Sequence, residues 1–383
     1  MKILFVNYEW PPLGGGGGVA MAQLVEALDP LHDLAVLTSR TRDARPLESA
    51  GQAPVYRARV LGRHSRSVAS MASMCSFVPA GVWRGWRVLR REHFDLINTW
   101  FAIPSGPTGV LLSRLFKIPH CLTLIGGDVY DPSKWYSPHR NAALRAVVRW
   151  AMEHSRFCTA ISNDVRERAQ AIFPREKTID VIPLGIRPPV FTPADRGAIG
   201  MDPDAFYCVT VGRLIRRKRL PLLVERFARS TDPKLKLLII GEGPEEAELR
   251  ASIQAGGLAG RVVLAGAVSE ERKFQYLANS DAYVSVSEHE GFGLVFLEAM
   301  ACGLPVVAPA IGGQRDFLRH GETGLVLDSD ADDLMRRVTD LYETPEKVIE
   351  MRAFNRRYVE RYFIDNVADL WAETFEKYIK SLY

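Results

Sequence analysis

The chain has 383 residues, more than one hydrophobic core usually supports, so we expect two domains. Its 47% hydrophobic and 25% charged residues are ordinary for a soluble globular protein. The five cysteines are scattered and never spaced as C-x-x-C, which argues against a disulfide framework or a structural zinc site.

The first residues of the chain and the distribution of its charge indicate the location and the partners of the protein. The first ten residues read as a strand without a cleavage site, and no run reaches the about 18 apolar residues of a membrane span, so we expect a cytoplasmic protein. Residues 1–187 carry 24 Lys and Arg against 15 Asp and Glu, a net charge of +9, whereas the remainder carries −5. The basic half indicates an anionic partner such as a membrane surface, or merely aids solubility. We expect no nucleic-acid partner.

Apolar strand-like segments alternate with glycine-bearing turns and amphipathic helical patterns, which is typical of parallel α/β structure. Strands are expected at residues 3–6, 34–37, 96–98, 121–124, 157–161 and 178–182. Residues 183–203 are too proline-rich for regular structure and read as a linker. A second series follows at residues 207–211, 236–240, 262–264, 282–286, 306–308 and 324–327. Two successive doubly wound units predict a cleft between domains, with ligands at the carboxyl ends of the strands.

Five consecutive glycines, residues 14–18, follow the first strand and precede a helix expected from about Val19. Glycine frees the backbone, and a helix N-terminus offers unshielded amides, so Gly15, Gly16 and Gly17 are candidate binding residues for a phosphate or sugar. The run is not a strict G-x-G-x-x-G element, and a purely structural turn is the alternative.

The second series opens with V-G-R-L-I-R-R-K-R-L, in which Arg213 and Lys218 follow a strand. A guanidinium and an ammonium can together neutralise a diphosphate leaving group. Three further arginines read as a solvated basic face: Arg216, Arg217 and Arg219.

The pattern E-x7-E, formed by Glu290 and Glu298, is the most informative in the chain. The glutamates flank a Gly-Phe-Gly turn that joins a strand to a helix, where free backbone amides can hold a phosphate. The second glutamate can accept hydrogen bonds from a diol such as ribose. Either acid alone would be a solvated carboxylate near a helix start, but together they fit a nucleotide sugar. The candidate amides belong to Gly291, Phe292, Gly293 and Leu294.

These motifs resemble the donor-binding signature of retaining glycosyltransferases of family 4, which have the GT-B fold. The resemblance covers nearly the whole chain and is strongest over residues 211–327. It implies an α/β fold of two Rossmann-like doubly wound domains that face an interdomain cleft. We expect the acceptor-binding domain at residues 1–187, a linker at 188–204, and the donor-binding domain at 205–365. The last helix, residues 366–383, is expected to pack back on the first domain.

The resemblance also implies roles for residues of this chain. Arg213 and Lys218 match the pyrophosphate clamp of the family. Gly241 lies in a turn near the donor with Gly243, and Val268 lies where the family holds the nucleotide base through its backbone. The loop I-G-G-Q-R-D, with Gly312, Gly313 and Asp316, matches a supporting loop beneath the donor.

The first domain departs from the family at one position. Its segment L-T-L-I-G-G-D-V is similar to the family's T-x-H-G-x-D, with Ile125 in place of the histidine and Asp128 retained. The departure removes a polar contact that commonly reaches the donor sugar. Asp128 either orients an acceptor hydroxyl or caps the following turn.

Two other patterns have competing interpretations. Asp328, Ser329 and Asp330 spell D-x-D, which can hold a metal in another fold, but helix capping explains them better, and we expect no metal or other cofactor. Residues 82–93 interleave Trp83 and Trp86 with arginines and follow the apolar stretch 68–82. That mixture suits a membrane interface with anionic lipid, or an ordinary amphipathic helix packed on the sheet.

The sequence thus predicts a retaining, metal-independent glycosyltransferase that moves a sugar from a UDP- or GDP-sugar to a hydroxyl acceptor. The expected acceptor is a cell-envelope polysaccharide or a lipid-linked intermediate, reached from the inner face of the membrane. Glu290, Arg213, Lys218 and Asp128 are the candidate catalytic residues. A front-face mechanism, in which the departing phosphate accepts the acceptor's proton, requires no enzyme nucleophile. A nucleotide-sugar epimerase and a non-catalytic nucleotide-sugar binding module are the alternatives.

Overall fold

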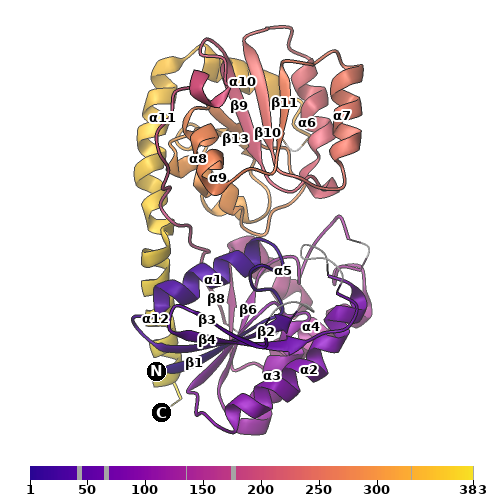
Figure 1. The fold of residues 1–383 in the computed structure, drawn as a ribbon, viewed down its shortest axis with the longest axis vertical. Helices are drawn as coiled ribbons and strands as arrows, with labels where there is room; N and C mark the ends of the chain where they lie inside the picture. Colours follow the sequence, from indigo (N-terminus) through magenta and orange to yellow (C-terminus); the bar gives the residue numbers. More distant parts are fainter. Residues whose placement is uncertain (41–44, 64–68, 135, 174–177, 329, 383) are drawn as a thin grey trace. The chain divides into compact units, whose positions relative to one another are not determined.

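The computed structural model describes residues 1–40, 45–63, 69–134, 136–173, 178–328 and 330–382 (Figure 1). Val68 and Ser329, which belong to two of the patterns above, lie outside these ranges. The chain divides into two compact units. Unit 1 comprises Met1–Arg187 and Tyr362–Tyr383, and unit 2 comprises Pro188–Arg361.

Unit 1 is built on an eight-stranded sheet in the order β3-β4-β2-β1-β5-β6-β7-β8. All neighbouring strands are parallel except the β3–β4 pair, which is antiparallel. The strands are β1 (Lys2–Asn7), β2 (Asp33–Arg40), β3 (Leu47–Ala50), β4 (Ala53–Arg59), β5 (Leu96–Trp100), β6 (His120–Leu124), β7 (Phe157–Ala160) and β8 (Ile179–Val181). The helices are α1 (Gly16–Leu28), α2 (Met71–Leu89), α3 (Ser105–Phe116), α4 (Ala142–Glu153), α5 (Asn163–Ile172) and α12 (Ile364–Lys380).

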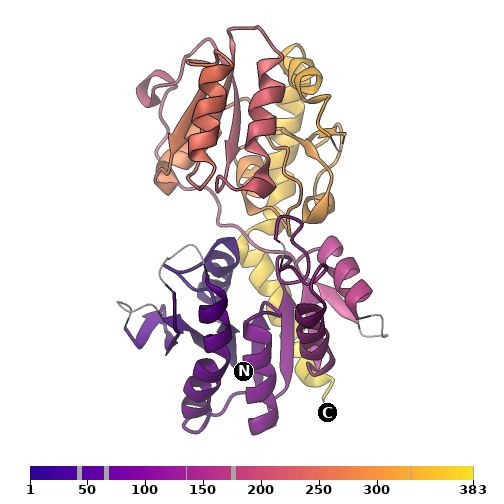
Figure 2. The same cartoon turned by 90° about the vertical axis from the view of Figure 1, so that its right-hand side faces the viewer.

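Helices cover both faces of this sheet, with α1 and α12 on one side and α2 and α3 on the other (Figures 1 and 2). Strands covered on both faces need apolar side chains throughout, and β5 and β6 are buried at every position. The apolar runs of the first half therefore correspond to β1, β2 and β5–β8. The β3–β4 hairpin was not predicted, because β3 is only L-E-S-A with no buried residue.

Helix α12 belongs to unit 1 and fills its core from the far end of the chain. Trp371 stacks on Trp100 with ring centroids 6.2 Å apart, and Phe375 meets the edge of Phe5 at 6.2 Å. All four rings are buried, so this contact joins the first and last parts of the sequence into one hydrophobic core.

Unit 2 has a six-stranded sheet in the order β11-β10-β9-β12-β13-β14, in which every pair is parallel. The strands are β9 (Phe206–Val211), β10 (Leu235–Ile240), β11 (Val262–Gly266), β12 (Ala282–Val284), β13 (Val306–Pro309) and β14 (Gly324–Leu327). The helices are α6 (Leu220–Ala228), α7 (Glu246–Ala255), α8 (Glu270–Ala278), α9 (Leu294–Ala301), α10 (Leu334–Tyr342) and α11 (Pro345–Tyr358). The strand order reverses beside β9, at the β9–β12 pair, so the ends of these two strands form the position where such sheets bind ligands.

The proline-rich segment 188–204, which we expected to be a linker, belongs to unit 2 and packs on its other elements. The guanidinium of Arg196 donates to the carbonyls of Asn279 and Ala205 and pairs with Asp281 at 2.7 Å. The segment contains a short 3-10 helix, η1 (Gly197–Ile199), despite the expectation that it would lack regular structure. Across the described ranges, no helix has both the length and the apolar character needed to cross a bilayer.

Candidate functional site

A buried ion cluster lies at the ends of β9 and β12 in unit 2. Glu290 follows β12 in the loop that leads to α9 and is 6% exposed. Lys218 and Arg217 come from η2 (Arg216–Lys218), the 3-10 turn after β9. The ammonium of Lys218 lies 2.7 Å from one carboxylate oxygen of Glu290, and the guanidinium of Arg217 lies 2.8 Å from the other. Two residues that the sequence singled out, Lys218 and Glu290, are therefore in direct contact.

The cations decide the charge of Glu290. Burial by itself would raise the pKa of this carboxyl, but the charges and hydrogen bonds of Lys218 and Arg217 outweigh it and lower the pKa to about 2. Glu290 is consequently ionised at neutral pH. Each of its oxygens accepts one of these hydrogen bonds and keeps a second lone pair for another donor.

Arg217 is the main correction to the sequence-based site. We expected it on a solvated basic face, yet its side chain is only 20% exposed. Besides Glu290 it donates to the backbone carbonyl of His289, and its own carbonyl accepts from the amide of Glu288 at 2.8 Å. Arg219 ends the turn in the left-handed region with φ of 50°. This irregular turn directs Arg217 inward, whereas Arg216 is exposed as expected.

Glycines allow the loops around this cluster to approach one another closely. A Cβ at Gly241 would lie 2.0 Å from the carbonyl oxygen of Gly212, and one at Gly243 would lie 2.4 Å from that of Leu214. Gly241 also has φ of +137°, which L side chains rarely adopt. These glycines therefore serve first to pack the β9 and β10 loops together.

The loop with Gly312 and Gly313 supports the chain around Glu290. A Cβ at Gly312 would lie 2.3 Å from the carbonyl oxygen of Glu290, and one at Gly313 would lie 2.1 Å from that of Gly291. The amide of Gly313 donates to the Glu290 carbonyl at 2.7 Å. The loop thus holds the backbone that carries the glutamate.

Residues 291–294 form the entry to α9. Gly293 is the N-terminal cap of the helix with φ of 99°, and Leu294 is the first helical residue. Phe292 is buried, and its ring meets the edge of Phe317 at 5.6 Å. The side chain of Phe292 is therefore part of the core.

Glu298 lies in a second ion cluster, one that sequence reasoning missed. Its carboxylate is 2.9 Å from the ammonium of Lys273 on α8, which also contacts Glu270 at 2.8 Å. Burial raises the pKa of Glu298, and the nearby charge of Glu270 adds to the rise, whereas Lys273 opposes it without offsetting it. Lys273 is only 8% exposed, although the sequence of α8 is mostly polar. Its burial results from the contact with Glu298 on α9, which the sequence of α8 alone does not indicate.

The remaining candidates of unit 2 are placed differently. Arg213 is exposed, and its side chain forms no ion pair within the part of the chain that the structure describes. Val268 is half-buried between β11 and α8. The structure therefore joins Lys218 with Glu290 but does not join Arg213 to them.

In unit 1, α1 begins at Gly16, three residues before the position that we expected, and Gly15 is its cap. The amide of Gly15 is not unshielded, because it donates to the carboxylate of Glu9 at 3.0 Å. A Cβ at Gly17 would lie 2.6 Å from the ring of Phe101, whereas one at Gly15 would meet nothing within 4 Å. A side chain at Gly15 would therefore meet open space, whereas the corresponding position at Gly17 is occupied by Phe101.

Asp128 is tied to the backbone. One of its oxygens accepts from the amide of Ala102 at 2.6 Å, and the other accepts from the amides of Ile125 and Gly126 at 3.1 and 2.8 Å. Burial raises the pKa of the Asp128 carboxyl, and these hydrogen bonds oppose that rise. Of the two roles left open by the sequence, the geometry favours the turn cap.

Within the described ranges, no group of three or more His, Cys, Asp or Glu residues is arranged to hold a metal ion. Asp330, part of the D-x-D pattern, accepts a hydrogen bond from the amide of Asp332 at 3.2 Å. This local contact is typical of a turn.

Sequence comparisons identify the class of protein. The family description "Glycosyl transferases group 1" matches residues 191–358, and "Glycosyl transferase 4-like domain" matches residues 15–185. The two matches together cover most of both units. The chain belongs to the group 1 glycosyltransferase family.

Three curated relatives have related names. N-acetyl-alpha-D-glucosaminyl L-malate synthase of Bacillus anthracis is 28% identical over 62% of this chain and 62% of its own. D-inositol 3-phosphate glycosyltransferase of Pseudarthrobacter chlorophenolicus is 30% identical over 68% and 66%. The alignments thus span less than two thirds of these two relatives. A putative teichuronic acid biosynthesis glycosyltransferase, TuaC of Bacillus subtilis, is 27% identical over 90% and 93%.

Solved structures define the fold. Sucrose-phosphate synthase of Thermosynechococcus elongatus has a TM-score of 0.87 at 23% identity, with all of both chains covered. Anabaena Alr3699/HepE in complex with UDP has a TM-score of 0.79 at 20% identity, over 98% of this chain and all of that one. The two sheets, parallel apart from the β3–β4 pair, form with their helices the GT-B fold, as expected.

Proposed function

We propose that this protein is a retaining, metal-independent glycosyltransferase that moves a sugar from a UDP- or GDP-sugar to a hydroxyl acceptor. The observation that carries the proposal is the cluster in which Lys218 and Arg217 hold the ionised Glu290 beside the start of α9. A carboxylate with free lone pairs, cations and helix-start amides within one loop region provides groups for a sugar and for a diphosphate.

The donor would bind to unit 2 in three parts. Glu290 accepts hydrogen bonds from hydroxyls of the transferred sugar through its free lone pairs. Lys218 and Arg213 neutralise the diphosphate, assisted by the amides of residues 291–294. Glu298 accepts hydrogen bonds from the ribose, and the backbone near Val268 contacts the base. A complex of the structural neighbour Alr3699/HepE contains UDP, which supports a nucleoside diphosphate as the ligand class.

Catalysis would consist of positioning and electrostatic stabilisation. As the glycosidic bond breaks, negative charge develops on the departing diphosphate, and Lys218 with Arg213 stabilises it. The departing phosphate accepts the proton of the acceptor hydroxyl on the face that it leaves, so the anomeric configuration is retained. The cations supply the charge that a metal supplies in other enzymes, which is why we propose no metal requirement.

The acceptor would be a cell-envelope saccharide or a lipid-linked intermediate bound to unit 1. The excess of basic residues in the first half of the chain supports a partner that carries phosphate. A relative named for teichuronic acid biosynthesis, aligned over most of both chains, also supports an envelope acceptor. Gly15, where a side chain would meet open space, is the candidate contact of the glycine loop.

A thermal-shift titration with UDP, GDP, ADP and TDP, each with and without EDTA, tests the donor site. A ligand that binds only the folded state raises the melting temperature by mass action. We expect one nucleotide to stabilise the protein equally in both conditions. A shift that EDTA abolishes would contradict metal independence, and no shift with any nucleotide would contradict the donor site.

Product analysis with the matching nucleotide sugar then tests the reaction. Transfer to an acceptor with retained configuration is the expected result. An isomerised donor formed without acceptor would instead identify an epimerase, and binding without turnover would identify a non-catalytic module.

A further inference from the structure

The outward face of α2 in unit 1 has an unusual composition. Met71, Cys75, Pro79 and Trp83 follow one another at intervals of four residues, and all are exposed. Trp83 is 61% exposed and Met71 is 45% exposed. The solvent side of a helix that packs on a sheet normally carries polar and charged residues. Three turns of α2 therefore present apolar groups where water would favour polar ones.

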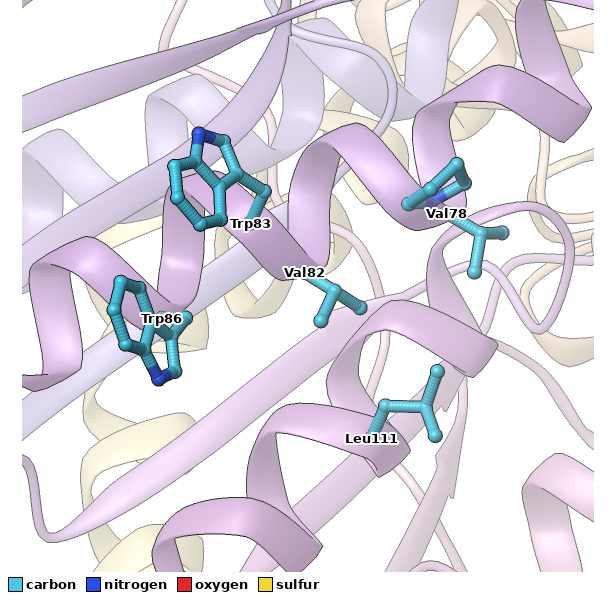
Figure 3. Close-up of a pocket in the computed structure, with 6 residues that line it drawn as sticks. Val78, Val82, Trp83, Trp86 and Leu111 are labelled. Atoms are coloured by element: carbon cyan, nitrogen blue, oxygen red, sulfur yellow. The ribbon is translucent and has the colours of Figure 1, made fainter.

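The neighbouring helix α3 continues this surface. Leu111 and Leu115 lie one turn apart and are 36% and 62% exposed. Between the two helices lies an apolar groove of about 510 Å³, lined by Val78, Pro79, Val82, Trp83, Trp86 and Leu111. Figure 3 shows Val82 directed toward Leu111, with both indoles on the same stretch of α2. The indole rings stack with centroids 5.4 Å apart and planes at 15°.

Positive charge gathers at one end of the groove. Because α2 and α3 both connect parallel strands, they run in the same direction, and their C-terminal ends lie on the same side. The exposed cations there are Arg87, Arg90 and Arg91 at the end of α2 and Arg114 and Lys117 at the end of α3. Neither helix contains an acidic residue.

The charge at this end is only partly neutralised. Glu92, the first acid after α2, is bonded to Tyr56 at 2.8 Å and to Lys2 at 3.1 Å. Burial, together with the charges of Arg87 and other arginines, lowers the pKa of Arg84. A site where arginines repel one another in this way attracts anions.

We infer that the α2–α3 surface docks on a lipid bilayer that contains anionic lipids. The apolar stripe and groove take up hydrocarbon at the level of the headgroups, and the arginines contact lipid phosphates. Stacked tryptophans beside arginines match the polarity of this interface, where one side is apolar and the other is wet and anionic. A protein partner would have to combine an apolar ridge with an acidic patch, whereas every anionic bilayer offers both groups.

The biological purpose of this membrane contact rests on the proposed function. Docking of the α2–α3 surface would bring unit 1 to the membrane in which a lipid-linked acceptor is embedded. Binding to the bilayer itself requires no nucleotide. The two proposals can therefore fail separately, because nucleotide stabilisation and vesicle binding are measured independently.

Co-sedimentation of the full chain with vesicles tests the surface. We compare vesicles of phosphatidylcholine with vesicles in which phosphatidylglycerol replaces part of it, at low and high salt. We expect binding to the anionic vesicles only, weakened by salt because exposed charges are screened. Equal binding to both compositions, or binding to neither, would overturn the inference.

Paired variants locate the contact. Trp83→Ala/Leu115→Ser and Arg87→Gln/Arg91→Gln should each weaken partition into anionic vesicles by about tenfold, since each cation and each buried apolar group contributes separately. Two controls alter equally exposed residues of unit 2, Ile349→Ser for the apolar pair and Arg336→Gln/Arg357→Gln for the cationic pair, and should bind as the unchanged protein does.

Two results would contradict the location. Unchanged vesicle binding by both α2–α3 variants, with their nucleotide-dependent rise in melting temperature intact, would show that the bilayer contact lies elsewhere. Self-association in the absence of lipid, lost in the Trp83→Ala/Leu115→Ser variant, would instead assign the surface to a second copy of this chain. If vesicle binding follows the expected pattern but no nucleotide stabilises the protein, only the proposed transferase activity fails.

Discussion

The two glutamates of the E-x7-E pattern lie in opposite electrostatic environments. Glu290 is held by Lys218 and Arg217, and its pKa is lowered to about 2. Glu298 faces Lys273, a cation shared with Glu270, and burial raises its pKa. The pKa values of two carboxyl groups in one motif can thus shift in opposite directions, because Glu290 contacts two cations and Glu298 contacts one shared cation.

This difference separates their proposed tasks. A fixed, ionised carboxylate such as Glu290 suits the reacting end of a donor, where geometry and charge must already be in place. A carboxylate that tolerates neutralisation, such as Glu298, suits neutral ribose hydroxyls, which provide hydrogen bonds rather than charge. The comparison therefore predicts larger effects at Glu290 than at Glu298.

The largest expected effect follows from Glu290→Gln. The amide keeps the size of the side chain but removes the charge, so we expect turnover to fall by about a hundredfold, on the scale of losing one preorganised electrostatic contact. Nucleoside diphosphate affinity should change far less. Single-turnover transfer and a nucleotide titration measure the two quantities, and unchanged turnover would remove Glu290 from the active site.

The second prediction concerns acid stability. Glu290 has a folded-state pKa of about 2 against an ordinary 4.5, which corresponds to about 3 kcal/mol of stability. Because the folded pKa is the lower one, this stability is present above about pH 4.5 and is lost as the pH falls toward 2. Glu298 has the opposite sign: its raised pKa gives stability at low pH that is lost as the pH rises through the folded pKa.

Denaturant unfolding as a function of pH checks this sign. In Glu290→Gln, the free energy of unfolding should decrease less on acidification than it does in the unchanged protein, because the variant has no carboxyl group to protonate at this position. Arg217→Gln, which removes one of the two cations, should shift that loss to higher pH, while the exposed neighbour Arg216→Gln should not. An identical acid profile in all four proteins would contradict the pairing.

The third prediction separates Arg213 from its exposed neighbour Arg216. If Arg213 binds the diphosphate, Arg213→Ala should weaken nucleoside diphosphate binding by about tenfold, the loss of roughly one charge-assisted hydrogen bond. Arg216→Ala, from the same turn region, should bind normally. Equal affinities in calorimetric titrations would exclude Arg213 from the clamp.

The sequence predicted those features of the fold that leave a pattern of apolar residues along the chain. Buried parallel strands require apolar runs, so the strands of both sheets other than β3 and β4 were predicted. The β3–β4 hairpin has no such run, and Arg57 of β4 is buried in an ion pair with Glu48. Helical periodicity also gave no indication that Arg217 turns inward, because η2 is a 3-10 turn ended by a left-handed residue.

The contact of Lys273 was also not predictable from the sequence, because it joins two different helices. Its partner Glu298 lies on a different helix, so no spacing within α8 relates the two residues. Likewise Glu9, whose carboxylate accepts the hydrogen bond from the amide of Gly15, lies six residues before it across a turn. Motif spacing predicts the groups of one loop, whereas cations supplied by neighbouring loops and helices emerge only from the fold.

The smallest expected effect belongs to Lys273. In Lys273→Met the mostly buried carboxylate of Glu298 loses the cation that faces it, so the melting temperature should fall and nucleotide affinity should drop about threefold. The double variant Lys273→Met/Glu298→Gln removes the unpaired charge as well, and its stability should recover toward that of Glu298→Gln alone. A coupling energy near zero in this double-mutant cycle would mean that the 2.9 Å contact contributes nothing to the folded state, and that Lys273 does not offset the effect of burial on Glu298.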